Sequence, residues 1–179
     1  MKRIVSLLFL IVLLACTFCK QNVETGITVS EAKALLDNAI KAYVGGDFTL
    51  IDKVWTTDYI LHDPAYPQEV RGLDSLKKVF EDGLKTFKSY KLQFENLIVK
   101  NDTIVAFFKW STTLSEPLNL PGVGIIPVSG KTIGYSGIYM GKVVKGKLAE
   151  DWFFYNPLDY YLALGFTLVP PQVLTPEKK

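Results

Sequence analysis

The side chains that could do chemistry gather at two points of this chain. Among 179 residues there is one histidine, His62, and its imidazole is a candidate general base because it titrates near neutral pH. The second point comprises Glu150, Trp152, Phe154 and Asn156, which alternate along one segment and would share one face of a strand. If that face is the inner one, it places an acid, an indole, a phenyl ring and an amide around one space. This is the composition of a small-molecule pocket.

Glu150 and His62 are therefore the candidate catalytic residues, and each role has a structural alternative. Burial of Glu150 beside Trp152 would favour its neutral acid and suit it to proton transfer. His62 could act from a cavity wall, or it could simply cap the turn that follows it. Asp63 should point away from His62, because neighbours in an extended segment lie on opposite faces, so the two are not an acid–base pair. Asn156 precedes a proline, which is also the sequence of a helix start capped by the amide.

Several aromatic residues are candidates for the wall of the same pocket. Tyr43 and Tyr135 could position a carbonyl group, although aromatic residues at regular spacing more often belong to a core. Trp110 and Lys109 lie on opposite faces of one expected strand, so we place Trp110 inside and Lys109 in solvent. The predicted ligand-binding residues are therefore Tyr43, Trp110, Tyr135, Trp152, Phe154 and Asn156.

Composition excludes two classes of function. One histidine and two cysteines are too few for the usual multi-His or Cys/His metal sites, and we expect neither a metal nor a cofactor. The formal net charge is +2, and Lys2 and Arg3 account for it. Without them the charges balance, so the chain lacks the basic surface of a nucleic-acid-binding protein.

The N-terminus has the pattern of an export signal. Lys2 and Arg3 are followed by an apolar run from Ile4 to Leu14 that is too short to span a bilayer comfortably. It ends in Leu-Leu-Ala-Cys16, which resembles the bacterial lipobox. The resemblance implies a signal peptide at 1–15, a lipid on Cys16, a tether at 16–28 and attachment to the bacterial cell envelope. Thr17, rather than Asp, favours the outer membrane if the organism has one. The alternatives are an ordinary signal cleaved nearby or a stray hydrophobic start.

The remaining chain has helical periodicity first and strand periodicity later. Apolar spacing predicts helices over 30–44, 47–55 and 73–87, with Ser30 as the first N-cap and a brief extended piece at 59–63. A period of two predicts strands at 90–100, 103–113, 131–140 and 148–155, before a short helix from Pro157 to Gly165 and a loose tail at 168–179. The apolar stretch 118–128 is expected to be a loop. This order predicts an α+β domain in which three helices cover one face of a curved antiparallel sheet. The other face needs a partner, either a second copy of the chain or the C-terminal tail, and we expect a homodimer.

Five short motifs, in this order and spacing, resemble the SnoaL-like polyketide cyclase (ester cyclase) family of the nuclear-transport-factor-2-like superfamily. They are His62-Asp63-Pro64, Arg71-Gly72, the segment 126–131, Gly146-Lys147-Leu148 before Glu150-x-Trp152, and Leu162-x-x-Gly165. The resemblance implies a cone-shaped α+β barrel over 29–167 with a deep pocket at one end. In cyclases of the family, a carboxylate four residues after the tryptophan removes a proton from carbon. Asn156 stands at that position, and an amide cannot accept that proton.

Three functions remain open at this point. The first is an anchored lipoprotein that binds a small, largely apolar molecule, which the missing carboxylate favours. The second is a cyclase- or isomerase-type enzyme that acts on a polyketide-like or keto-ester substrate by acid–base chemistry at Glu150 or His62. The third is a scaffold that binds another envelope protein.

Overall fold

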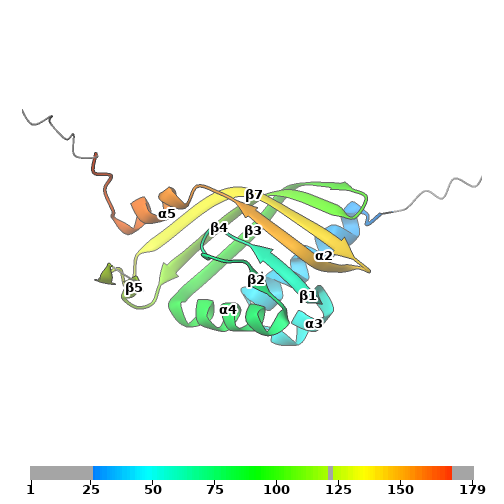
Figure 1. Ribbon diagram of the computed structural model, residues 1–179, viewed down its shortest axis with the longest axis horizontal. Coiled ribbons are helices and arrows are strands. Elements are labelled where there is room, and N and C mark those ends of the chain that lie inside the picture. The colour runs from blue at the N-terminus through cyan, green and yellow to red at the C-terminus, as the bar shows by residue number, and fades with distance from the viewer. Residues whose placement is uncertain (1–25, 121–122, 171–179) are drawn as a thin grey trace, which may run out of the picture.

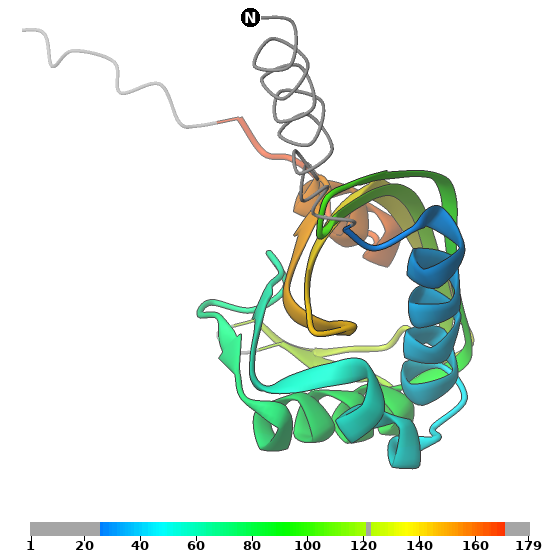
Figure 2. The ribbon, with the colours of Figure 1, turned by 90° about the vertical axis from the view of Figure 1, so that its right-hand side faces the viewer.

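The fold is built on one curled sheet of six strands. The computed structural model describes residues 26–120 and 123–170. In space the strands follow the order β2-β1-β8-β7-β4-β3, and the sheet curls around a central space (Figure 1 and Figure 2). Their bounds are β1 Trp55–His62, β2 Val70–Arg71, β3 Phe87–Lys100, β4 Thr103–Leu114, β7 Thr132–Val144 and β8 Lys147–Phe154.

All neighbouring strands in this sheet are antiparallel except one pair. β1 and β8 run parallel, with Ile60 opposite Glu150 and His62 opposite Trp152. The α+β class and the helix-covered curved sheet are confirmed, but the expectation of a purely antiparallel sheet is wrong for this pair. A parallel pair needs a long crossover, and here nearly the whole domain separates the first strand from the last.

The helices close the open side of the curl. α2 (Val29–Tyr43) and α4 (Leu73–Thr86) lie along the concave side of the sheet, as Figure 2 shows, and a short 3₁₀ turn η1 (Phe48–Leu50) leads into α3 (Ile51–Val54). The N-cap of α2 is Thr28, two residues before the predicted cap, because Thr28 and Glu31 form a reciprocal capping box. α5 (Pro157–Leu164) follows β8 and ends at Gly165, whose left-handed backbone suits glycine.

The core lies between the helices and the concave face. β4 alternates strictly between buried and more exposed residues, which places Ile104, Ala106, Phe108 and Trp110 inside. Fully burying a side chain such as Ile104 or Phe108 stabilises the fold by about 1.5–3 kcal/mol. Lys109 lies outside as predicted and forms an ion pair with Glu95 at 2.9 Å.

Two segments differ from the sequence prediction. β1 starts at Trp55, where a helix was expected to end, so the extended piece is longer than 59–63. The apolar stretch 118–128 contains a small hairpin, β5 (Leu118–Leu120) paired with β6 (Gly124–Ile126). The predicted signal peptide at 1–15, the predicted lipidation site Cys16 and the last nine residues of the tail lie outside the described residues. None of the helices within the described ranges is long and apolar enough to cross a membrane.

The convex face of the sheet carries a continuous apolar surface. Strand register aligns Ile98, Val105, Met140 and Trp152 in one row across four strands, and Phe107, Ile138 and Phe154 in the next. We call these seven residues the outer apolar face. Phe154 is 52% exposed and Ile138 is 44% exposed. Apolar side chains gathered in this way favour an interface, which supports the homodimer that we propose.

Candidate functional site

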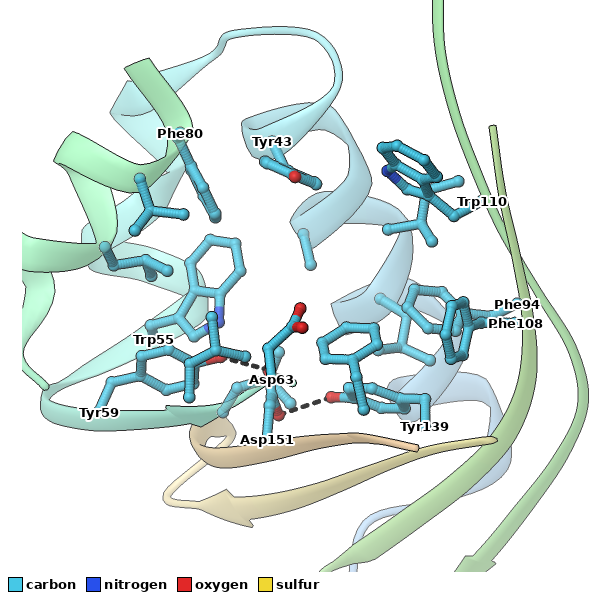
Figure 3. Close-up of a pocket in the computed structure, with 18 of the residues that line it drawn as sticks. Tyr43, Trp55, Tyr59, Asp63, Phe80, Phe94, Phe108, Trp110, Tyr139 and Asp151 are labelled. Carbon is cyan, nitrogen blue, oxygen red and sulfur yellow. Dashed lines mark hydrogen bonds between the residues drawn. The ribbon is translucent and has the colours of Figure 1, made fainter. Parts of the chain in front are cut away.

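A small inner chamber lies where the helices meet the concave face of the sheet. Its volume is about 80 Å³, which admits a few water molecules or one substituent of a ligand. Two carboxyl groups, Asp63 and Asp151, are the acidic groups in a wall that is otherwise apolar or aromatic. Figure 3 shows side chains from both helices and from the sheet converging on this space. The apolar wall includes Leu36, Ala39, Trp55, Leu76, Phe80, Phe94, Phe108 and Phe153.

A larger outer chamber adjoins the inner one. Its volume is about 220 Å³, close to the lower limit of roughly 300 Å³ for pockets that hold small molecules. The two chambers share Tyr43, Asp63, Tyr66, Trp110 and Tyr135. The rest of the outer wall is Pro64, Ala65, Phe87, Tyr90, Tyr155, Pro157, Tyr160 and Tyr161. The outer chamber is therefore an aromatic vestibule, with one carboxyl group where it meets the inner chamber.

Asp63 directly follows the end of β1, and its carboxyl group points into the space between the chambers (Figure 3). Oδ1 accepts hydrogen bonds from the Tyr155 hydroxyl at 2.6 Å and from the Ala65 backbone N–H at 2.8 Å. The Tyr155 ring in turn stacks on Tyr135, with ring centroids 4.3 Å apart. Burial raises the pKa of Asp63, and the two hydrogen bonds to Oδ1 partly offset that rise. The carboxyl group is thus oriented by two donors while Oδ2 accepts no hydrogen bond from the described residues.

Asp151 forms a second polar centre at the base of the inner chamber. It is only 4% exposed, and it accepts hydrogen bonds from Tyr59 at 2.8 Å and Tyr139 at 2.7 Å. Burial raises its pKa to about 6, against the opposing effect of the two tyrosine hydroxyls. Gly141 makes room for this group, since a Cβ there would lie 2.2 Å from the Tyr139 hydroxyl. The buried indole N–H of Trp55, on the wall of the same chamber, has no hydrogen-bond partner among the described residues.

A bulge in β8 decides which residues reach the chambers. Val143 pairs with Leu148, but Lys142 pairs with Glu150, so Ala149 is an extra residue in this strand. Leu148 and Asp151, three residues apart, are consequently both buried on the concave side. An extra residue exchanges the two faces for the rest of the strand, because side chains alternate with a period of two.

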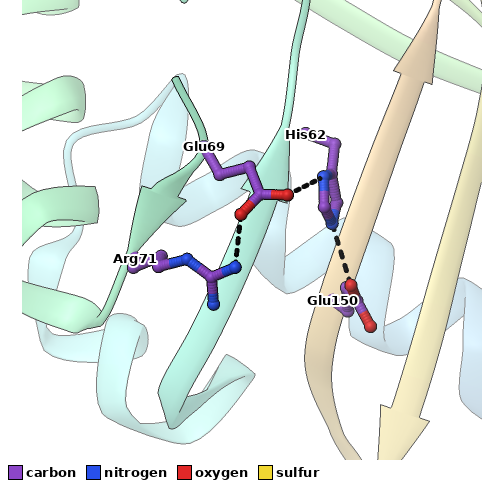
Figure 4. A network of polar contacts seen from close by, with 4 residues as sticks. All are labelled: His62, Glu69, Arg71 and Glu150. Atoms are coloured by element: carbon purple, nitrogen blue, oxygen red, sulfur yellow. Dashed lines mark hydrogen bonds and ion pairs between the residues drawn. The ribbon is translucent and has the colours of Figure 1, made fainter.

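The predicted catalytic pair lies on the opposite face of the sheet. His62 Nε2 is 2.8 Å from Glu150 Oε1, and Nδ1 is 3.0 Å from Glu69 Oε1, while Arg71 also pairs with Glu69 (Figure 4). The imidazole stacks on Trp152 with ring centroids 4.9 Å apart. Both ring nitrogens face carboxylates, so both hydrogen bonds form together only when the ring carries two protons.

A family model described as SnoaL-like polyketide cyclase matches residues 33–164. The chain belongs to the SnoaL-like polyketide cyclase family. Membership indicates a ligand-binding or cyclase role. No curated protein matches the chain.

Solved structures show the same fold. TsrD from Streptomyces laurentii is 22% identical with a TM-score of 0.64, and the match covers 78% of this chain and 98% of TsrD. A candidate polyketide cyclase from Acidithiobacillus ferrooxidans is 24% identical with a TM-score of 0.64, over 77% of this chain and 97% of that one. An LEH-like epoxide hydrolase from M. tuberculosis is 10% identical with a TM-score of 0.59, over 75% and 90% of the two chains.

Some of the predicted pocket residues line the two chambers and others do not. Tyr43, Trp110 and Tyr135 line both chambers of this SnoaL-like domain, as expected. Glu150, His62, Trp152 and Phe154 line neither of these two chambers, because the bulge at Ala149 turns that face of β8 outwards. His62, Trp152 and Phe154 instead line a separate hollow of about 380 Å³. Asn156 lies outside both linings.

Asn156 has the capping role that its sequence allowed. Its side-chain oxygen accepts a hydrogen bond from the Leu158 backbone N–H at 3.1 Å, at the start of α5. The position at which SnoaL-like cyclases have a carboxylate is therefore a helix cap here. The acidic groups that this chain brings to its chambers are Asp63 and Asp151 instead.

Sequence reasoning missed these two aspartates for different reasons. The sequence did contain a signal for Asp63. Strand alternation places it on the face opposite His62, and His62 lies on the outer face of the sheet. Asp151 had none, because the single-residue bulge before it leaves no mark in the sequence pattern. The described residues contain no cluster of His, Cys, Asp and Glu suited to hold a metal ion.

Proposed function

We propose that the protein binds a small, largely apolar, ring-containing molecule in the outer chamber, with Asp63 as its polar anchor. The observation that carries this proposal is the position of Asp63, whose oriented carboxyl group lies between an aromatic vestibule and an apolar inner chamber. A pocket with apolar walls and one or two fixed polar groups is the usual form of a small-molecule site. We also propose that Cys16 carries the lipid that attaches the domain to the envelope.

A pair of tryptophan substitutions tests binding at this place. Ala65 is an exposed residue on the wall of the outer chamber, so Ala65→Trp should obstruct the opening without overpacking the core. Gln68 is an exposed residue of the same loop that lines neither chamber, so Gln68→Trp is the matched control. Calorimetric titration of the full-length protein with neutral bicyclic compounds such as 2-naphthol should give saturable binding.

The two variants should then separate. Ala65→Trp should weaken binding by at least about tenfold, or about 1.4 kcal/mol, and Gln68→Trp should leave it unchanged. Equal weakening in both variants would show that the compound does not bind in the outer chamber. If calorimetry and native mass spectra of the wild type reveal no ligand of any tested class, the proposal fails.

A second candidate function, proton transfer at carbon, is favoured by one specific observation. The Tyr155 hydroxyl donates a hydrogen bond to Asp63, and burial raises the pKa of this carboxyl group toward neutral pH, where a general base is most effective. The protein should then exchange the α-protons of a bound cyclic ketone with deuterium, as followed by NMR, and Asp63→Asn should abolish exchange. Binding without exchange above the buffer rate would retain the first proposal and reject this one.

A further inference from the structure

The aromatic rings of the outer chamber form a continuous wall in which some neighbouring rings are nearly perpendicular. Tyr43 and Tyr90 meet at 74° with centroids 4.7 Å apart, and Tyr90 meets Trp110 at 84° and 5.3 Å. From Trp110 the wall continues as a stack, through Tyr135 at 4.6 Å to Tyr155 at 4.3 Å. Rings set at such angles enclose a space on more than one side. A chamber enclosed in this way resembles an aromatic cage rather than a flat slot.

The charge in this cage is negative and has no counterion. The lining of the two chambers contains Asp63 and Asp151 but no lysine, arginine or histidine. Within the described ranges, Asp63 forms no ion pair, and only its Oδ1 accepts hydrogen bonds. A carboxylate largely withdrawn from water is costly unless a positive group or further donors compensate it. The empty side of Asp63 therefore faces the volume where a ligand would lie.

Aromatic walls and an unpaired carboxylate favour the same kind of ligand. The faces of tyrosine and tryptophan rings attract cations, and aromatic cages of this kind hold quaternary ammonium groups. A primary ammonium carries three N–H donors that all need acceptors, whereas a fully alkylated ammonium needs none. The methyl groups of such a cation can also contact apolar walls.

We propose that the ligand of the outer chamber is a small organic cation with a fully alkylated ammonium group, seated between Asp63 and the ring wall of Tyr43, Tyr90 and Trp110. This inference rests on the proposed function, because it names the ligand class for the same chamber. It differs in requiring a positive charge rather than apolar character alone.

Choline and its carbon analogue 3,3-dimethylbutan-1-ol provide a direct test. The two molecules have nearly the same shape, and a neutral carbon replaces the charged nitrogen in the second. Calorimetric titration of the full-length protein should show choline binding at least about tenfold more tightly than the analogue, which corresponds to about 1.4 kcal/mol. This comparison uses only the wild type and does not depend on the folding of any variant.

Substitution of the anchor extends the test. Asp63→Asn keeps the shape of the side chain but removes its charge, so it should weaken choline by at least about tenfold and leave the neutral analogue unchanged. Asp52→Asn is the matched control, since Asp52 is 72% exposed on α3 and lines neither chamber. It should preserve the preference for choline.

The outcomes distinguish this inference from the proposed function. The neutral analogue could bind as tightly as choline, or neither could bind while 2-naphthol does. Either result rejects the proposal of a cationic ligand and retains the proposal of an apolar ligand in the outer chamber. Undiminished choline affinity in Asp63→Asn overturns the role of the carboxylate. If none of the three compounds binds, both proposals fall.

Discussion

Replacing Asp151 by asparagine should change how the stability of the protein depends on pH. An aspartate of the unfolded chain titrates near pH 3.9, whereas burial raises the pKa of Asp151 to about 6 in the folded protein. The folded state therefore binds the proton more tightly than the unfolded state. The resulting stabilisation is fully present below about pH 4 and is lost as the pH rises through 6.

The size of the effect follows from the gap between these two pKa values. A gap of about two units corresponds to about 3 kcal/mol in total, at 1.36 kcal/mol per unit. Between pH 4.5 and pH 7.5 the part that is lost amounts to about 2 kcal/mol. Asp151→Asn cannot titrate, yet it keeps an oxygen that can accept a hydrogen bond from Tyr59 or Tyr139.

Urea unfolding followed by tryptophan fluorescence measures this difference directly. The free energy of unfolding of the wild type, minus that of Asp151→Asn, should fall by about 2 kcal/mol from pH 4.5 to pH 7.5. All other titrating groups are common to both proteins and cancel in the comparison. The exposed Asp52→Asn variant should show no such change. A difference for Asp151→Asn that is constant within about 0.5 kcal/mol, or that rises with pH, would refute the reasoning.

Three further predictions concern the core, the outer apolar face and the N-terminus. Phe108 is 1% exposed and packs edge-on against Tyr135 and Phe153, so Phe108→Ala should lower the free energy of unfolding in urea by about 3–5 kcal/mol; a loss below about 1 kcal/mol would contradict this packing. The wild type should sediment as a homodimer at micromolar concentration and Ile138→Glu as a monomer, because the new charge would lie in the middle of the proposed interface; a monomeric wild type would reject that interface. Cells fed labelled palmitate should label the wild type but not Cys16→Ser, and an unlabelled wild type would contradict lipidation.

The sequence predicted the fold through periodicity. Helical spacing before residue 87 and strand spacing after it were sufficient for an α+β domain with a helix-covered sheet, and the short motifs were sufficient for the family. Tyr43, Trp110 and Tyr135 line the chambers. For Trp110 and Tyr135 the alternation along the strand holds, because β4 and β7 pair without a bulge. Local patterning carries this information reliably when the strand is unbroken.

The chemistry of the site could not be predicted in the same way. The extra residue at Ala149 exchanges the faces of β8, so a strand read with a strict period of two places Glu150 inside and Asp151 outside. The parallel pairing of β1 with β8 brings Asp63 beside Tyr155, and no local pattern encodes that neighbour. Contacts between distant segments depend on register, which is set by the packing of the whole sheet.

The pairing of the first strand with the last also bears on the order in which the protein can fold. The contacts Tyr59–Asp151, His62–Glu150 and Asp63–Tyr155 join residues that are 92, 88 and 92 positions apart. Structures dominated by such distant contacts fold slowly, because long loops must close before these contacts can stabilise them. In a growing chain that has not yet reached β8, the two-residue strand β2 is the only neighbour that β1 has in this sheet. Between them, the linings of the two chambers include residues from β8 and from the segment after it, so the pocket is completed only when synthesis is nearly finished.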